Sequence, residues 1–134
     1  MRVALIISQN AVRRVAIATT LVGAVVPVEV GCREGIYDME QLHRGNIALV
    51  YLDACFLRDE DGQLSAPSHI KNICSRTTDG PFVIGACSTA GGDVCAGIFA
   101  ELRRHGLHNS DKITVVPTDD NLYAAVRAEL SASC

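Results

Sequence analysis

A continuous apolar run that ends in a single carboxylate constrains the fold of this chain more than any other feature. The run covers residues 47–52, follows Asn46 and ends at Asp53. Uninterrupted apolar strands are typical of parallel sheets that are covered by helices, because both faces of such a strand are buried. In open parallel sheets, functional groups gather beyond the carboxyl ends of the strands. The run therefore predicts that Asp53 lies at the functional edge of a parallel sheet.

Four further apolar segments predict the rest of this sheet, at residues 3–7, 25–30, 82–87 and 113–116. These segments alternate with amphipathic ones, which predicts right-handed crossovers and helices on both faces. Pro27 has no N–H to donate, so its strand belongs at a sheet edge. We predict an α/β fold in which residues 1–134 form a single domain, a doubly wound, five-stranded parallel sheet of order 2-1-3-4-5 with five helices.

Capping residues and periodic apolar positions locate the five helices. The first is expected between the cap Asn10 and Gly23, and the second over residues 34–44, closing at Gly45. The others are expected to begin near Pro67, near Asp93 and near Asp119 or Asp120. The expected inward faces are, in chain order, Val12, Val15, Ala16, Thr19 and Val22; Ile36, Met39, Leu42 and His43; Ile70, Ile73 and Cys74; Val94, Cys95, Ile98, Phe99 and Leu102; and Leu122, Ala125, Val126 and Leu130.

Composition excludes several classes of function. The chain has a formal charge of −3, 4% aromatic residues and no basic cluster, which argues against binding to nucleic acid. Six cysteines are scattered without a C-x-x-C pair, as expected for buried thiols in a reducing compartment. The apolar stretch over residues 15–28 is interrupted by Thr19-Thr20 and Pro27 and is too short to span a bilayer. We therefore expect a cytoplasmic domain that does not bind a membrane.

Several short motifs, taken in order, resemble those of a response-regulator receiver domain of the CheY-like type. The motifs are Ser8-Gln9-Asn10 after the first strand, residues 49–53 at the phospho-acceptor strand, Asp61-Gly62 in the next loop, Pro81 before the fourth strand and Val116-Pro117 after the fifth. The resemblance covers nearly all of the chain. It implies the receiver fold, with Asp53 at the phospho-acceptor position.

The same resemblance shows which parts of the receiver mechanism this sequence lacks. In that family a histidine kinase donates a phosphoryl group to an aspartate, with a magnesium ion held by the aspartate and by an acidic pair at the end of the first strand. Ser8 and Gln9 stand at the acidic-pair positions, and neither carries charge. Magnesium would bind only weakly through Asp53 alone.

Other positions of the family pattern are also changed. Val116 stands where the family places a lysine, and it offers the phosphate neither charge nor a donor. The hydroxyl position at the end of the fourth strand falls on Ala86, or on Ser88 if the register shifts. Ile113 occupies the aromatic switch position. Phosphoryl transfer depends on positioning the phosphoryl group and on neutralising the charge of its oxygens. These changes therefore remove the side chains that would do so in the family.

We therefore predict a degenerate receiver, or pseudo-receiver, that acts by protein–protein interaction in a two-component or phosphorelay pathway. It is expected to have neither enzymatic activity nor a cofactor, and Asp53 would accept hydrogen bonds from nearby backbone or from Ser8. Partners would be a histidine kinase or an output domain. By the resemblance, a homodimer would form through the fourth helix, fifth strand and fifth helix. That face contains Arg104, Tyr123 and Arg127, and Tyr123 lies off the apolar stripe as an expected interface anchor.

Two alternatives remain open at this point. In the first, the domain is a phosphorylatable receiver in which Asp59 or Asp61 supplies a relocated magnesium site for Asp53. In the second, the domain is a flavodoxin-like binder of a small molecule or anion, using the glycine-rich loop at residues 88–92. Arg13 and Arg14 would face a partner or solvent, and the solvated arrangement is favoured.

Overall fold

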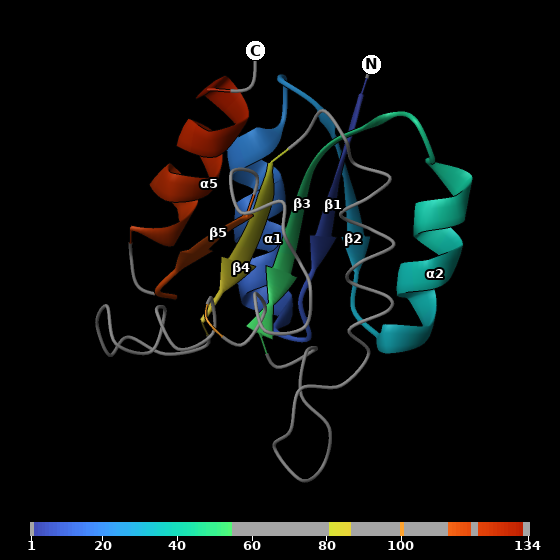
Figure 1. Cartoon of the computed structure of the whole chain (residues 1–134), viewed down its shortest axis with the longest axis horizontal. Helices are drawn as coiled ribbons and strands as arrows, with labels where there is room; N and C mark the ends of the chain where they lie inside the picture. The colour runs from blue at the N-terminus through green and yellow to red at the C-terminus, as the bar shows by residue number, and fades with distance from the viewer. Residues whose placement is uncertain (1, 55–80, 87–99, 101–112, 119–120, 133–134) are drawn as a thin grey trace, which may run out of the picture.

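The computed structural model describes residues 2–54, 81–86, 100, 113–118 and 121–132 (Figure 1). Along the chain these residues form β1 (Val3–Ile7), α1 (Ala11–Leu21), β2 (Val26–Val30), α2 (Arg33–Leu42), β3 (Ile47–Asp53), β4 (Phe82–Gly85), β5 (Ile113–Val116) and α5 (Leu122–Ala132). The helices predicted to begin near Pro67 and Asp93 lie outside the described residues, apart from Ala100.

The strands form one parallel sheet in the order β2-β1-β3-β4-β5, as predicted. The second strand lies at an edge, where Pro27 pairs in register with Ala4 of β1 and its missing N–H interrupts no inner ladder. β3 lies in the middle, and all seven of its residues are buried. The strand that the apolar run predicts is therefore the centre of the sheet.

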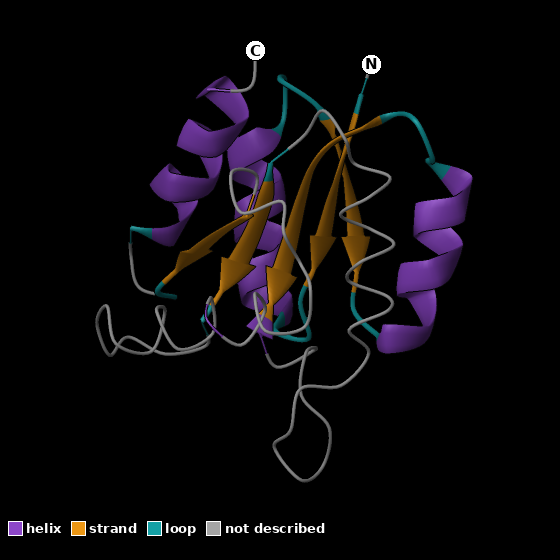
Figure 2. Cartoon of the chain, viewed as in Figure 1, coloured by secondary structure: helices purple, strands orange, loops and turns teal. Residues whose placement is uncertain are grey.

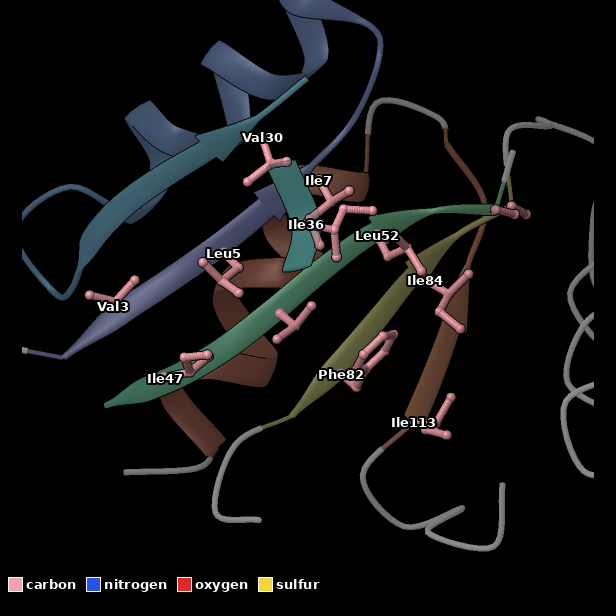
Figure 3. Packing of buried hydrophobic residues seen from close by; sticks show 13 residues of the cluster. Val3, Leu5, Ile7, Val30, Ile36, Ile47, Leu52, Phe82, Ile84 and Ile113 are labelled. Atoms are coloured by element: carbon pink, nitrogen blue, oxygen red, sulfur yellow. The ribbon is translucent and has the colours of Figure 1, made fainter. Parts of the chain in front are cut away.

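Two apolar clusters cover the two faces of the sheet. Figure 2 shows the strands of this sheet together with the helices that pack against it. One cluster joins alternate residues of the strands to Ile36 of α2, and Figure 3 shows how its side chains pack along β1, β3, β4 and β5. The other joins the intervening residues, including Tyr51, to α1 and α5. Because side chains alternate along a strand, Tyr51 and Asp53 point to the same face, the one that α1 and α5 cover.

The face that α1 buries differs from the predicted one. The buried residues of this helix are Ile17, Ala18 and Leu21. The predicted inward residues Val12, Val15 and Val22 are instead 79%, 52% and 62% exposed. The helix carries two apolar stripes, and the periodicity of either one satisfies the amphipathic pattern. The stripe that faces the sheet is set by packing against α5 and the strands.

This correction has a direct test in the stability of two variants. Ile17→Ala is expected to lower the free energy of unfolding by about 2–4 kcal/mol, because it leaves a cavity in the core. Val12→Ala should change it by less than about 0.5 kcal/mol, because the Val12 side chain already lies in solvent. Urea denaturation followed by circular dichroism measures both. Equal losses in the two variants would contradict the orientation of α1.

The other predictions for the described helices are largely confirmed. Asn10 caps α1, with its side-chain oxygen accepting a hydrogen bond from the Arg13 amide at 3.0 Å. Gly45, the predicted stop after the second helix, adopts a positive φ of 81°. Leu42, predicted to face inward on α2, is 69% exposed, because it lies on the last turn beyond the sheet-facing Ile36. On α5, the predicted Leu122, Val126 and Leu130 are buried and Ala125 is half-buried.

Candidate functional site

Asp53 ends β3 as a buried carboxylate, with 1% of its surface exposed. Three side chains donate to it. The Tyr51 hydroxyl binds Oδ1 at 2.5 Å, the Ser8 hydroxyl binds Oδ2 at 2.5 Å, and Nη1 of Arg13 binds Oδ2 at 2.9 Å. Both carboxylate oxygens are therefore engaged by groups of the chain itself.

Ser8 reaches the carboxylate because β1 and β3 are neighbours whose carboxyl ends meet at one edge. Ile7 pairs in register with Leu52, so the residues that follow them lie side by side. Ser8 is fully buried, its hydroxyl accepts a hydrogen bond from the Asn10 amide at 3.1 Å, and its carbonyl accepts one from Nη1 of Arg14 at 2.8 Å. The predicted hydrogen bond between Ser8 and Asp53 is confirmed. Gln9, the other acidic-pair position, is exposed.

Arg13 is a member of this site that sequence reasoning missed. It lies three residues after the cap Asn10, in the first turn of α1, and this turn stands over the ends of β1 and β3. Its side chain is 20% exposed and forms an ion pair with Asp53. The expectation that Arg13 faces solvent is therefore wrong. Its position just after the cap was the available signal, because the first turn after a parallel strand lies at the functional edge.

Tyr51 is the second member that was missed, because the apolar run counted it as core. Its side chain is fully buried, and a buried phenol hydroxyl needs a hydrogen-bond partner. Asp53, two residues along the same face of β3, supplies that partner. This combination of a buried tyrosine and a carboxylate at i+2 is a signal that the sequence did contain.

Gly85 makes room for this phenol. It is the β4 residue that pairs in register with Asp53. A Cβ atom at this position would overlap the hydroxyl oxygen of Tyr51 and would lie 2.9 Å from Cγ2 of Thr118, which follows β5. The Tyr51 ring thus extends from β3 across β4 toward the end of β5. It closes the space between Asp53 and the end of β5.

The centre of this arrangement is the ion pair between Arg13 and Asp53. The guanidinium compensates the carboxylate charge, and two hydroxyls donate to its remaining lone pairs. Among the described residues, no cluster of three or more His, Cys, Asp or Glu side chains that could hold a metal ion occurs. Glu29, the nearest acidic partner on β2, pairs instead with Arg14 at 3.2 Å. The described residues around Asp53 therefore do not fit a divalent cation.

The other predicted site positions that the structure describes, Ala86, Val116 and Ile113, have apolar side chains. Ala86 is buried in the α2-side cluster, and its amide donates to the Val116 carbonyl at 2.9 Å. Val116 is half-buried and packs against the cluster on the α1 and α5 face, whereas Ile113 is buried in the opposite one. Ser88, the loop at 88–92, Arg104, Asp59 and Asp61 lie outside the described residues.

Two predicted interface residues lie on α5. Tyr123 is half-buried and packs against the cluster on the α1 face, so its expected place off the apolar stripe is only partly right. Arg127 is exposed, and its Nη1 donates to the Thr20 carbonyl at 2.5 Å, near the last turn of α1. A cation there complements the partial negative charge of a helix C-terminus. Arg127 thus joins α5 to α1.

None of the helices in the described part of the chain is long and apolar enough to cross a membrane.

Comparisons with known proteins place the fold. No family model matches the sequence, and no curated protein matches it either. Among solved structures, a response regulator receiver protein from Sinorhizobium medicae is similar with a TM-score of 0.63 and 15% identity, over 99% of this chain and 97% of that one.

Two further structures agree over similar lengths. An orphan response regulator of H. pylori has a TM-score of 0.62 and 17% identity, with 96% of each chain covered. A response regulator from Thermotoga maritima has a TM-score of 0.61 and 14% identity, with 98% of each chain covered. The motif resemblance is thereby confirmed at the level of the fold: this chain has the fold of response-regulator receiver domains.

Proposed function

We propose that this chain is a pseudo-receiver, a signalling domain of two-component or phosphorelay type that acts by protein–protein contact and takes up no phosphate at Asp53. The observation that carries the proposal is the state of Asp53, whose two oxygens are held by Tyr51, Ser8 and Arg13. The receiver fold supports the signalling context, and the site supports the loss of phosphorylation.

Uptake of a phosphoryl group would require a free carboxylate oxygen to attack phosphorus and cations to neutralise the transferred oxygens. Here Oδ2 accepts hydrogen bonds from Ser8 and Arg13, and Oδ1 accepts one from Tyr51. The Tyr51 ring fills the space beside Gly85 and Thr118, which is the side from which β4 and β5 would supply their groups. The side chains of Val116 and Ala86 are apolar and offer the phosphate neither a charge nor a hydrogen-bond donor.

The partner in this proposal is a protein, such as a histidine kinase or an output domain. A homodimer through the fourth helix, β5 and α5 remains part of it, with the partly exposed Tyr123 as the anchor. The domain has neither cofactor nor catalytic activity of its own in this proposal. In this proposal the domain acts in the cytoplasm.

Amide chemical shifts test the proposal. When Mg²⁺ and then beryllofluoride are added to the ¹⁵N-labelled protein, the amides of Asp53, Ala86 and Val116 are expected to stay in place, because no carboxylate oxygen is free to bind either species. The Asp53→Asn variant is the matched control, and its response should equal that of the wild type. Shifts that start at Asp53, extend into β5 and vanish in Asp53→Asn would instead establish a phosphorylatable receiver.

A further inference from the structure

We infer that the guanidinium of Arg13 permanently neutralises the charge of Asp53. It thereby takes the role that a bound divalent cation would have at such a carboxylate. The inference rests on the proposed function and deepens it, because it names the residue that closes the site. It also assigns Arg13 a positioning role, since the same contact holds the first turn of α1 against the sheet.

The geometry around Oδ2 favours a guanidinium over a metal ion. Nη1 of Arg13 lies 2.9 Å from this oxygen, and the Ser8 hydroxyl lies 2.5 Å from it. Mg²⁺ binds oxygens at about 2.1 Å and prefers carboxylates and water as ligands. A divalent cation on Oδ2 would have to displace these donors and would be repelled by the guanidinium charge. Magnesium therefore does not fit the part of the Asp53 surroundings that the structure describes.

A closed ring of hydrogen bonds explains why the arginine stays in place. The Arg13 amide donates to the Asn10 side chain at 3.0 Å, and the Asn10 amide donates to the Ser8 hydroxyl at 3.1 Å. The Ser8 hydroxyl donates to Asp53, and the Arg13 guanidinium returns to the same carboxylate. The backbone and the side chain of Arg13 are thus both held, so little additional entropy is lost in keeping the ion pair formed.

The ring also places a negative charge, that of Asp53, at the N-terminus of α1. The first turn of this helix contains no acidic residue, although a negative charge is favourable at a helix N-terminus. Asp53 supplies this charge from β3. Arg14, the neighbouring residue, has a different role, since it contacts Glu29 and the Ser8 carbonyl. Among the described residues, Arg13 is therefore the charged group in contact with Asp53.

Terbium luminescence tests this inference with a reporter that the site already contains. The chain has no tryptophan and three tyrosines, one of which is Tyr51, in direct hydrogen-bond contact with Asp53. A Tb³⁺ ion bound at Asp53 would therefore be sensitised by excitation of Tyr51, because the energy transfer acts over a short range. The variants are Arg13→Ala, Arg13→Gln and Arg13→Lys. Gln keeps a neutral donor that helps to preserve the fold, and Lys keeps the charge.

The wild type and Arg13→Lys are expected to show only background luminescence. Arg13→Ala and Arg13→Gln should show a signal at least about tenfold above wild type, which corresponds to about 1.4 kcal/mol of gained binding at equal ion concentration. Excess Mg²⁺ should displace the Tb³⁺, and adding Asp53→Asn to either variant should abolish the signal. Arg44→Ala removes the same charge from an exposed position and should stay at background.

The outcomes separate this inference from the proposed function. If folded Arg13→Gln gives no more signal than Arg44→Ala while the wild type is also silent, Arg13 is not the group that excludes the cation, and the inference alone fails. If the wild type binds Tb³⁺ and Mg²⁺ at Asp53, the site is open and the proposed function fails as well. Retention of the circular dichroism spectrum shows that each variant is folded.

Discussion

Replacing Arg13 with alanine is expected to lower the free energy of unfolding by about 3 kcal/mol. The reason is that Asp53, with 1% of its surface exposed, would keep a buried charge without its cationic partner. Breaking a buried ion pair on one side costs about 3–5 kcal/mol, and the partial exposure of Arg13 places the loss near the lower end. Urea denaturation followed by circular dichroism provides the measurement. A loss of this size is a large share of the stability of a small domain.

A double-mutant cycle shows whether the charge is the cause. In the Arg13→Ala background, Asp53→Asn should recover part of the lost stability, because the neutral amide needs no cation. Its oxygen still accepts a hydrogen bond from one of the two hydroxyls, and its NH2 group donates to the other, which rotates to accept. Arg14→Ala is a neighbouring comparison and should cost about 1 kcal/mol, since its partner Glu29 is 40% exposed whereas Asp53 is buried. Strictly additive effects of Arg13→Ala and Asp53→Asn would show that the two side chains are not coupled.

The second large effect is expected from adding one methyl group at Gly85. Gly85→Ala should destabilise the protein by about 3 kcal/mol, because its Cβ would overlap the Tyr51 hydroxyl and press on Thr118. Tyr51 is fully buried, so a displaced ring would press against its core neighbours. The clash would also displace the phenol from Asp53, so the variant loses a buried hydrogen bond as well as packing. The midpoint and slope of urea unfolding measure this loss.

The steric cause can be separated from any other property of glycine by changing the tyrosine. In a Tyr51→Val background, which is itself destabilised by the lost ring, Gly85→Ala should cost less than about half as much as in the wild type, because the clash with the phenol is gone and only the contact with Thr118 remains. The backbone of Gly85 is not among the positive-φ glycines, so conformational freedom is not its role. A cost that is equal in both backgrounds would contradict the packing of Tyr51 against Gly85.

The strand order of the sheet was predictable because three sequence-readable constraints determine it: an apolar central strand, a proline at an edge strand and right-handed crossovers. Residues 47–52 form an unbroken apolar segment that only a strand buried on both faces explains, and Pro27 places its own strand at an edge. With right-handed crossovers, these two constraints leave the observed strand order. The place of Asp53 beside Ser8 follows from that order, so this contact was predictable as well.

The rest of the site depends on lateral packing, which periodicity does not encode. The periodicity of α1 does not distinguish its two apolar stripes, because Val12 and Val15 fit the helical repeat as well as Ile17 and Leu21 do. The orientation that buries Val12 and Val15 would point Arg13 away from Asp53, so the ion pair does not follow from the sequence pattern. Tyr51 and Gly85 form a complementary pair across two strands, and only the register between β3 and β4 brings them together.

The ring that joins Asn10, Ser8, Asp53 and Arg13 also bears on how the domain opens. Helix ends ordinarily fray, and their amides exchange with solvent through small local openings. At the start of α1, such an opening would separate Arg13 from a carboxylate that stays buried in the sheet, which is far more costly than the loss of one exposed turn. The first turn of α1 and the end of β3 should therefore exchange their amide hydrogens together, as one cooperative unit whose opening requires much of the domain to unfold.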